Sequence, residues 1–225
     1  MARNKKSDLG SDAVVVIGLG RFGSSVAVSL LRLGHEVLAI DEDAGLAQRW
    51  SDELTHVVAA DSTDEEALKQ LGVGGFSRAV VGIGNNIEAS VLTVLALSEL
   101  GVRDIWAKAV SVKHGKILRS VGAHHVIYPE ATMGERVAHL ITSRMLDFIE
   151  LDDGFAIAKT RAPRDAAGRT LADAGLRATY GVTVVGVKAQ GTDFVFAAPE
   201  TVVPGNGVLI VAGTTEQVER FAART

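Results

Sequence analysis

Short apolar runs alternate with helical patterns between Val14 and Tyr128. In the helical stretches, apolar residues return every three or four positions, as they do on one face of a helix. The runs between them are rich in the aliphatic and β-branched residues that buried strands favour. The predicted strands are Val14–Ile17, Glu36–Ile40, His56–Ala60, Ala79–Ile83, Ile105–Ala109 and His125–Tyr128. This alternation predicts a parallel sheet with helices on both faces.

A capping motif and several glycines set the predicted helix boundaries. Thr63 and Glu66 have the spacing of a capping box, so we expect a helix to start after Thr63. Glycine follows each of four predicted helices, where a left-handed backbone often ends a helix. These glycines are Gly34, Gly72, Gly101 and Gly122. Strands and helices in this order indicate an α/β domain with a Rossmann-like, doubly wound parallel sheet.

The pattern changes after Pro129. An apolar stripe predicts one amphipathic helix from Thr132 to Asp147, which covers either the end of the sheet or a neighbouring subunit. Short strands and a final helix from Thr215 then predict a second, smaller α+β C-terminal domain. Its predicted strands are Ala156–Thr160, Val182–Val187, Phe194–Ala197 and Gly207–Ala212.

The predicted organisation has four parts. They are a disordered N-terminal tail over residues 1–12, a first domain over 13–131, a linker or dimerisation helix over 132–148 and a C-terminal domain over 149–225.

Composition excludes several classes of function. The chain has 225 residues, 47% of them apolar, which is enough for substantial cores. The formal net charge is −4 and no segment concentrates Lys and Arg, so we expect no nucleic-acid partner. With no cysteine, disulfides and thiolate chemistry are excluded. No apolar window is long enough to span a membrane, and Asp8 and Asp12 interrupt the stretch that would otherwise resemble a secretion signal, so we expect a cytoplasmic protein.

The segment Gly18–Gly23 fits the pattern G-x-G-x-x-G, directly after the first predicted strand and at the start of a helix. Gly18 permits a tight turn, Gly20 lets backbone N–H groups approach a pyrophosphate, and Gly23 lets the helix lie close to the sheet. The helix N-terminus adds positive potential. The predicted cofactor contacts in this loop are Gly18, Leu19, Gly20, Arg21, Phe22 and Gly23.

Two acidic positions follow the next strands. Asp41 stands eighteen residues after Gly23, where a carboxylate accepts both ribose hydroxyls and repels a 2′-phosphate. The alternative for Asp41 is a solvated acid at a strand end. Asp61 or the neighbouring Ser62 meets the adenine edge, or the two cap the next helix.

Arg21 is unusual because it lies in the first turn of a helix, where the dipole disfavours a cation. A guanidinium there is most useful for a terminal phosphate beyond the two that the loop amides neutralise, as in ATP. The alternative is that Arg21 points to solvent or pairs with a surface carboxylate.

The sequence resembles the KTN or RCK domains that regulate potassium conductance in Ktr and Trk potassium uptake systems. The likeness covers nearly all of the first domain, and Arg177–Gly181 extends it to the second. The segments that carry it in the first domain are Gly18–Gly23, Gly34–Asp41, Ala59–Asp64, Ile83–Ser90, Ile105–Ala109, Gly122–Glu130 and Met133–Gly134.

The resemblance implies a regulatory assembly and its ligands. Dimers would form an octameric ring under a separate membrane potassium channel subunit of the KtrB or TrkH kind, peripheral to the inner face of the membrane. ATP and ADP would hold different ring shapes, with Arg21 at the γ-phosphate. Arg177 and Ala178 fit a cyclic di-AMP site of some relatives, although some of these have asparagine where this chain has Thr183.

The resemblance also assigns Glu130 to a cation such as Mg²⁺ near the phosphates, shared by two copies across the dimer. Alternatively, Glu130 caps the helix that follows it. Lys108 would lie near the phosphate edge or on the open surface, and Asn86 would contact the ligand or start a helix. The remaining contacts implied are Glu42, Gly84 and Asn85.

Two other functions compete with a non-enzymatic gating subunit. NAD is an alternative ligand, because Asp41 serves either ribose. An NAD-binding oxidoreductase would need a substrate domain, for which about 75 residues leave little room. An NADH-responsive redox sensor that represses transcription would need a DNA-binding helix-turn-helix, and no such pattern is present. The histidines are scattered without the spacing of metal ligands.

Overall fold

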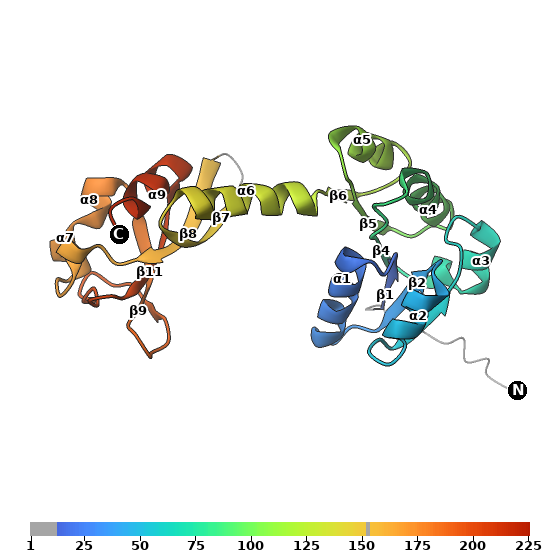
Figure 1. Ribbon diagram of the computed structural model, residues 1–225, viewed down its shortest axis with the longest axis horizontal. Coiled ribbons are helices and arrows are strands. Elements are labelled where there is room, and N and C mark those ends of the chain that lie inside the picture. The colour runs from blue at the N-terminus through green and yellow to red at the C-terminus, as the bar shows by residue number, and fades with distance from the viewer. Residues whose placement is uncertain (1–12, 152–153) are drawn as a thin grey trace, which may run out of the picture. The chain divides into compact units, whose positions relative to one another are not determined.

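The computed structural model describes residues 13–151 and 154–225 (Figure 1). Its internal contacts divide the chain into two compact units, one ending at Glu130 and one running from Ala131 to Thr225. The tail predicted to be disordered, residues 1–12, lies outside the described residues. Each unit has its own apolar core.

The first unit contains a six-stranded sheet in the order β3-β2-β1-β4-β5-β6, with every pair parallel. The strands are β1 Val14–Ile17, β2 Val37–Asp41, β3 His56–Ala59, β4 Arg78–Val81, β5 Asp104–Lys108 and β6 His125–Ile127. This order confirms the predicted Rossmann-like sheet. The chain adds strands outward on one side of β1 up to β3 and then on the other side from β4, so the strand order reverses between β1 and β4. In such sheets ligands bind outside the carboxyl ends of the strands at that point.

Both faces of the sheet are covered. Val15 and Ile17 of β1 belong to one apolar cluster, whereas Val14 and Val16 belong to another, because successive side chains point to opposite faces. All four are at most 3% exposed. The helices of this unit are α1 Arg21–Arg32, α2 Ala44–Trp50, α3 Glu65–Gln70, α4 Ile87–Glu99 and α5 Val112–Ser120, with a 3₁₀ turn, η1, at Val73–Gly75.

The predicted start of α3 needs a correction. Asp64, not Thr63, caps this helix, because its Oδ1 accepts the N–H groups of Glu66 at 2.9 Å and Ala67 at 3.3 Å. Thr63 instead donates both its N–H and its hydroxyl to Asp61 Oδ1. A carboxylate one residue further on therefore outcompetes the hydroxyl of Thr63 as the cap.

The second unit has a five-stranded antiparallel sheet in the order β10-β9-β11-β8-β7. Its strands are β7 Met145–Glu150, β8 Phe155–Arg161, β9 Thr183–Lys188, β10 Val195–Phe196 and β11 Val208–Thr214. Its shorter helical elements are η3 Arg164–Ala166, α7 Leu171–Ala174, α8 Leu176–Tyr180 and α9 Thr215–Ala222. The predicted smaller α+β domain is thus confirmed, including the helix that begins at Thr215.

The helix predicted over 132–147 is shorter than expected. Helix α6 spans Pro129–Thr142, and Met145–Glu150 forms strand β7 along β8. Met145 and Phe148 are 5% and 2% exposed in the core of the second unit, so pairing and burial override the helical spacing of these apolar residues. Among the described residues, no helix is long and apolar enough to cross a membrane.

Strand β7 can be tested through its buried aromatic residue. Phe148→Ala should lower the free energy of unfolding of the second unit by about 3–5 kcal/mol, because it leaves a cavity in the core. Ile149→Ala is the control, since Ile149 neighbours Phe148 and is 53% exposed. Urea unfolding of both variants measures the difference. Equal losses would contradict the assignment of this segment to a strand with one buried face.

Candidate functional site

The glycine loop between β1 and α1 is shaped by close backbone contacts. Gly18 has φ +87°, a left-handed conformation, and its N–H donates to Ile40 O at 2.8 Å. A Cβ on Gly23 would lie 1.8 Å from the Gly18 carbonyl oxygen. Packing within the chain therefore explains the first and third glycines of the motif.

Gly20 has a different environment. A Cβ on this residue would meet no protein atom within 4 Å, and its φ of −61° is accessible to any residue. Gly20 is the N-cap of α1 and provides no side-chain cap, so the first-turn amides of the helix face outward without a side-chain acceptor. The space above the second glycine suits the close approach of an anion to these amides.

Asp41 fixes the loop from the neighbouring strand. Its Oδ2 accepts the Leu19 N–H at 2.5 Å, and its Oδ1 accepts the Asp43 N–H at 2.9 Å. The residue is 8% exposed, so its carboxylate is buried rather than solvated. A carboxylate has about four acceptor positions, which leaves about two for ribose hydroxyls. The adjacent Glu42 is exposed.

A second group of predicted residues gathers beside the loop. Lys108 Nζ, at the end of β5, lies 2.6 Å from Glu130 Oε1 and 5.9 Å from the centre of the Phe22 ring. A Cβ on Gly84 would lie 3.1 Å from the same Nζ, so a larger residue there would crowd the ammonium group. Lys108 is therefore enclosed, with 13% of its side chain exposed, rather than free on the surface.

The charges of this group influence one another. The pKa of Glu130 is lowered, first by the hydrogen bond from Lys108 and then by its own backbone amide, and the positive charges of Lys108 and Arg21 add to the effect. Arg21, Lys108 and Glu130 thus share one electrostatic environment at the start of α1. Arg21 itself is exposed.

Other predicted contacts have structural partners. Asn86 caps α4, because its Oδ1 accepts the Ala89 N–H at 3.0 Å, whereas Asn85 is exposed. The Ser62 hydroxyl is buried 2.8 Å from the Thr93 hydroxyl.

Asp61 is exposed, and its Oδ1 accepts two hydrogen bonds from Thr63. Its pKa is lowered by the hydroxyl of Thr63 and then by the Thr63 N–H. Since Asp64 caps α3, neither Asp61 nor Ser62 has the capping role.

Two further predicted sites are the cation site at Glu130 and the cyclic dinucleotide site at Arg177 and Ala178. Among the described residues, no three His, Cys, Asp or Glu side chains lie together in a way that holds a metal ion. A cation at Glu130 would have to displace Lys108 and find further ligands outside this chain. In the second unit, Arg177 Nη2 donates to Thr183 Oγ1 at 2.7 Å, and Ala178 is exposed beside it.

The fold and the loop define a Rossmann-type domain with a glycine-rich turn between β1 and α1, followed by a small α+β domain with an antiparallel sheet. The TrkA-N domain model matches residues 14–129, and the TrkA-C domain model matches residues 158–225. The chain belongs to the TrkA family of potassium uptake proteins, which confirms the resemblance seen in the sequence.

Two relatives from Bacillus subtilis match nearly the whole chain. Ktr system potassium uptake protein C is 40% identical over 93% of this chain and 95% of its own length. Ktr system potassium uptake protein A is 38% identical over 92% and 93%.

Solved structures show the same fold. The GsuK RCK domain superimposes with a TM-score of 0.65 at 22% identity, over 94% of this chain and 47% of its own. The GsuK channel bound to NAD superimposes with a TM-score of 0.62 at 21% identity, over 91% of this chain. This chain spans about half of the first of these structures and 38% of the second.

The different environments of the glycines predict different phenotypes. Gly23→Ala should destabilise the first unit, because its Cβ would collide with the backbone of the loop. Gly20→Ala should leave the melting temperature nearly unchanged but weaken phosphate binding at least about tenfold, because its methyl group fills the space that an anion needs. Thermal melts and titration with ADP measure the two effects. A Gly20→Ala variant that binds ADP as tightly as the unchanged protein would remove the loop from the site.

Proposed function

We propose that this protein is a nucleotide-sensing subunit that regulates a separate potassium channel or transporter in the membrane. The observation that carries the proposal is the open, uncapped start of α1 above Gly20, next to Arg21 and the enclosed Lys108. Because two relatives are named potassium uptake proteins, we take potassium transport to be the process that the nucleotide controls.

Different residues of the loop and its surroundings bind different parts of the nucleotide. The amides at the start of α1 hold the diphosphate, since they have no acceptor in the cap. Asp41 accepts the ribose hydroxyls with its remaining lone pairs while it keeps the loop in place through Leu19. Arg21 reaches the terminal phosphate that ATP has and ADP lacks, so that the protein distinguishes the two ligands. Such a difference in affinity is what a ligand needs to move a conformational equilibrium.

The Lys108–Glu130 ion pair links the ligand to the second unit. A phosphate that approaches Lys108 competes with Glu130 for the ammonium group. Glu130 then loses its ion pair with Lys108, and its carboxylate repels the nearby phosphate. A cation such as Mg²⁺, bound by Glu130 of this subunit and by a second copy of the protein, relieves this repulsion. Because Glu130 lies in the first turn of α6, the exchange acts on the helix that leads into the second unit.

The assembly completes the proposal. Two copies pair, and dimers form an octameric ring against a membrane channel subunit of the KtrB or TrkH kind, at the cytoplasmic face. Helix α6 offers an apolar stripe for such pairing, with Met133, Val137 and Ile141 between 43% and 77% exposed. Arg177 and Ala178 would contribute to a cyclic di-AMP site at the seam of paired C-terminal domains.

NAD is the second candidate ligand, with an NAD-binding oxidoreductase or an NADH-responsive sensor as the corresponding function. The observation in its favour is the buried Asp41, whose carboxylate accepts the ribose hydroxyls of NAD as readily as those of ATP. A solved relative of the same fold is the GsuK channel bound to NAD. Arg21 favours ATP, because NAD has no terminal phosphate.

The role of Arg21 can be separated from general loss of charge. Arg21→Ala should weaken the binding of ATP at least about tenfold and the binding of ADP by less than about twofold. The reason is that the variant loses a charge-assisted hydrogen bond to the terminal phosphate, which only ATP has. Arg32→Ala is the matched control, since it removes the same charge from the last turn of the same helix. Calorimetric titration measures all the constants. Equal losses for the two nucleotides would end the γ-phosphate role.

A further inference from the structure

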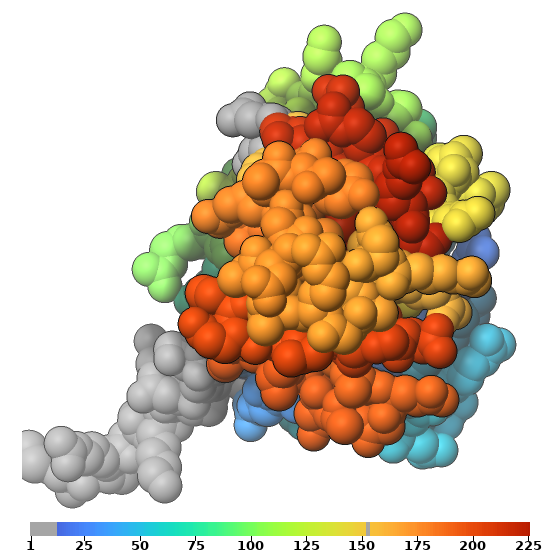
Figure 2. Space-filling model, turned by 90° about the vertical axis from the view of Figure 1, so that its left-hand side faces the viewer, coloured from blue at the N-terminus to red at the C-terminus, as the bar shows by residue number. Residues whose placement is uncertain are grey.

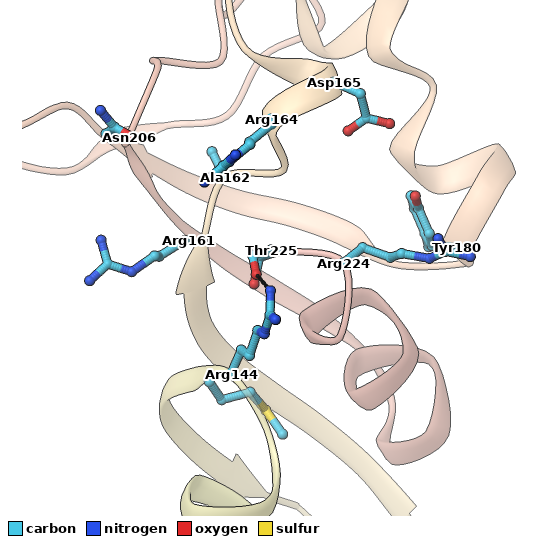
Figure 3. Close-up of a pocket in the computed structure, with 10 residues that line it drawn as sticks. Arg144, Arg161, Ala162, Arg164, Asp165, Tyr180, Asn206, Arg224 and Thr225 are labelled. Carbon is cyan, nitrogen blue, oxygen red and sulfur yellow. Dashed lines mark hydrogen bonds between the residues drawn. The ribbon is translucent and has the colours of Figure 1, made fainter.

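The second unit contains a hollow of about 980 Å³ around which four arginines gather (Figure 3). They come from separate segments: Arg144 from the bend before β7, Arg161 from the end of β8, Arg164 from η3, and Arg224 from beyond α9. Figure 2 shows this unit from outside, with the light orange segment after β8 next to the dark red of α9. Arg161 and Arg164 are three residues apart, whereas Arg144 and Arg224 are distant from them in the sequence and are brought to the same hollow by the fold.

The arginines surround the hollow from several directions. In Figure 3, Arg164 reaches in from η3, Arg144 rises toward Thr225, and Arg224 and Arg161 extend to opposite sides. Opposing them are the Asp165 carboxylate and the oxygens of Thr225, whose carbonyl oxygen lies 2.8 Å from Arg144 Nη1. Positive charge therefore predominates in the lining.

Three of these arginines differ from the others in the unit. Within residues 131–151 and 154–225, Arg161, Arg164 and Arg224 have no side-chain hydrogen bond or salt bridge. The arginines outside the hollow all have one: Arg136 with Asp147, Arg169 with the Asp173 carbonyl, Arg177 with Thr183 and Arg220 with Glu216. Guanidinium groups that repel one another across a hollow gain from an anion between them.

The chemistry of the lining favours phosphate. A guanidinium presents a planar fork that matches two phosphate oxygens, and groups around a hollow suit a compact anion with several charges. The volume is at the upper end of the range for small-molecule sites and is far larger than one phosphate needs. Tyr180 and the buried Met145 supply an apolar wall on which the uncharged part of such a molecule can lie.

We propose that this hollow binds a molecule that carries two or more phosphate groups. The site is separate from the glycine loop, which belongs to the other unit, and from Arg177, whose guanidinium is held by Thr183. The phosphates belong either to a soluble compound or to the headgroup of an anionic lipid that carries two phosphates, and both present the same oxygens to the arginines.

The test uses inorganic tripolyphosphate as the probe on the full chain. Arg164→Gln combined with Arg224→Gln should weaken one binding event at least about tenfold, and higher salt should weaken that event in the unchanged protein. Arg220→Gln is the matched control, because it removes an exposed arginine of the same unit outside the hollow. Arg21→Ala should leave this event in place, which separates the hollow from the nucleotide site of the proposed function.

A second arm identifies the source of the phosphate. Co-sedimentation compares vesicles that contain cardiolipin, an anionic lipid with two phosphates, with vesicles of phosphatidylcholine alone. Binding to the cardiolipin vesicles that is lost in the double variant, without tripolyphosphate binding, assigns the site to a lipid headgroup. The proposal is overturned if neither probe binds, if the double variant and Arg220→Gln lose affinity equally, or if only an acidic polyglutamate peptide binds.

Discussion

The contact between Gly23 and the Gly18 carbonyl is the constraint on which the rest of the site depends. Because no Cβ fits between them, α1 starts directly over the end of β1 and presents its first amides at the point where the strand order reverses, between β1 and β4. Asp41 completes the arrangement from the next strand by accepting the Leu19 N–H. A loop held from both sides is preorganised, so that a ligand has little backbone entropy to remove when it binds.

In the proposed function, the cations around this loop give the site its selectivity among phosphate ligands. The backbone amides and the dipole of α1 attract any phosphate. Arg21 and Lys108 add side-chain charges at defined positions, so they favour ligands that have a phosphate at those positions. Lys108 lies between Phe22 of the glycine loop and Glu130, the acidic residue in the first turn of α6. In the proposed function, phosphate binding therefore changes the charge balance at the start of α6 through this one ammonium group.

Local patterns predicted the features that a short stretch of chain determines. The parallel sheet followed from apolar runs that alternate with helical patterns, and the position of Asp41 at the end of β2 followed from the length of the predicted strand. The sequence did not reveal that Asp41 bonds Leu19 or that Ser62 is buried against Thr93, since those partners are distant in the chain. Met145–Glu150 is a strand because β8 pairs with it, which periodicity alone does not show. The hollow lined by arginines could not be predicted from the sequence either, because it forms only when several segments of the second unit pack together.

The most direct test of this account is a calorimetric titration of the nucleotide-free protein with ATP, ADP, NAD⁺ and NADH, each with and without Mg²⁺. The account predicts that ATP and ADP bind and that neither nicotinamide nucleotide binds more tightly than they do. If NAD⁺ or NADH binds about tenfold or more tightly than ATP, a difference of about 1.4 kcal/mol, the role of Arg21 is contradicted and the protein senses the nicotinamide nucleotide instead.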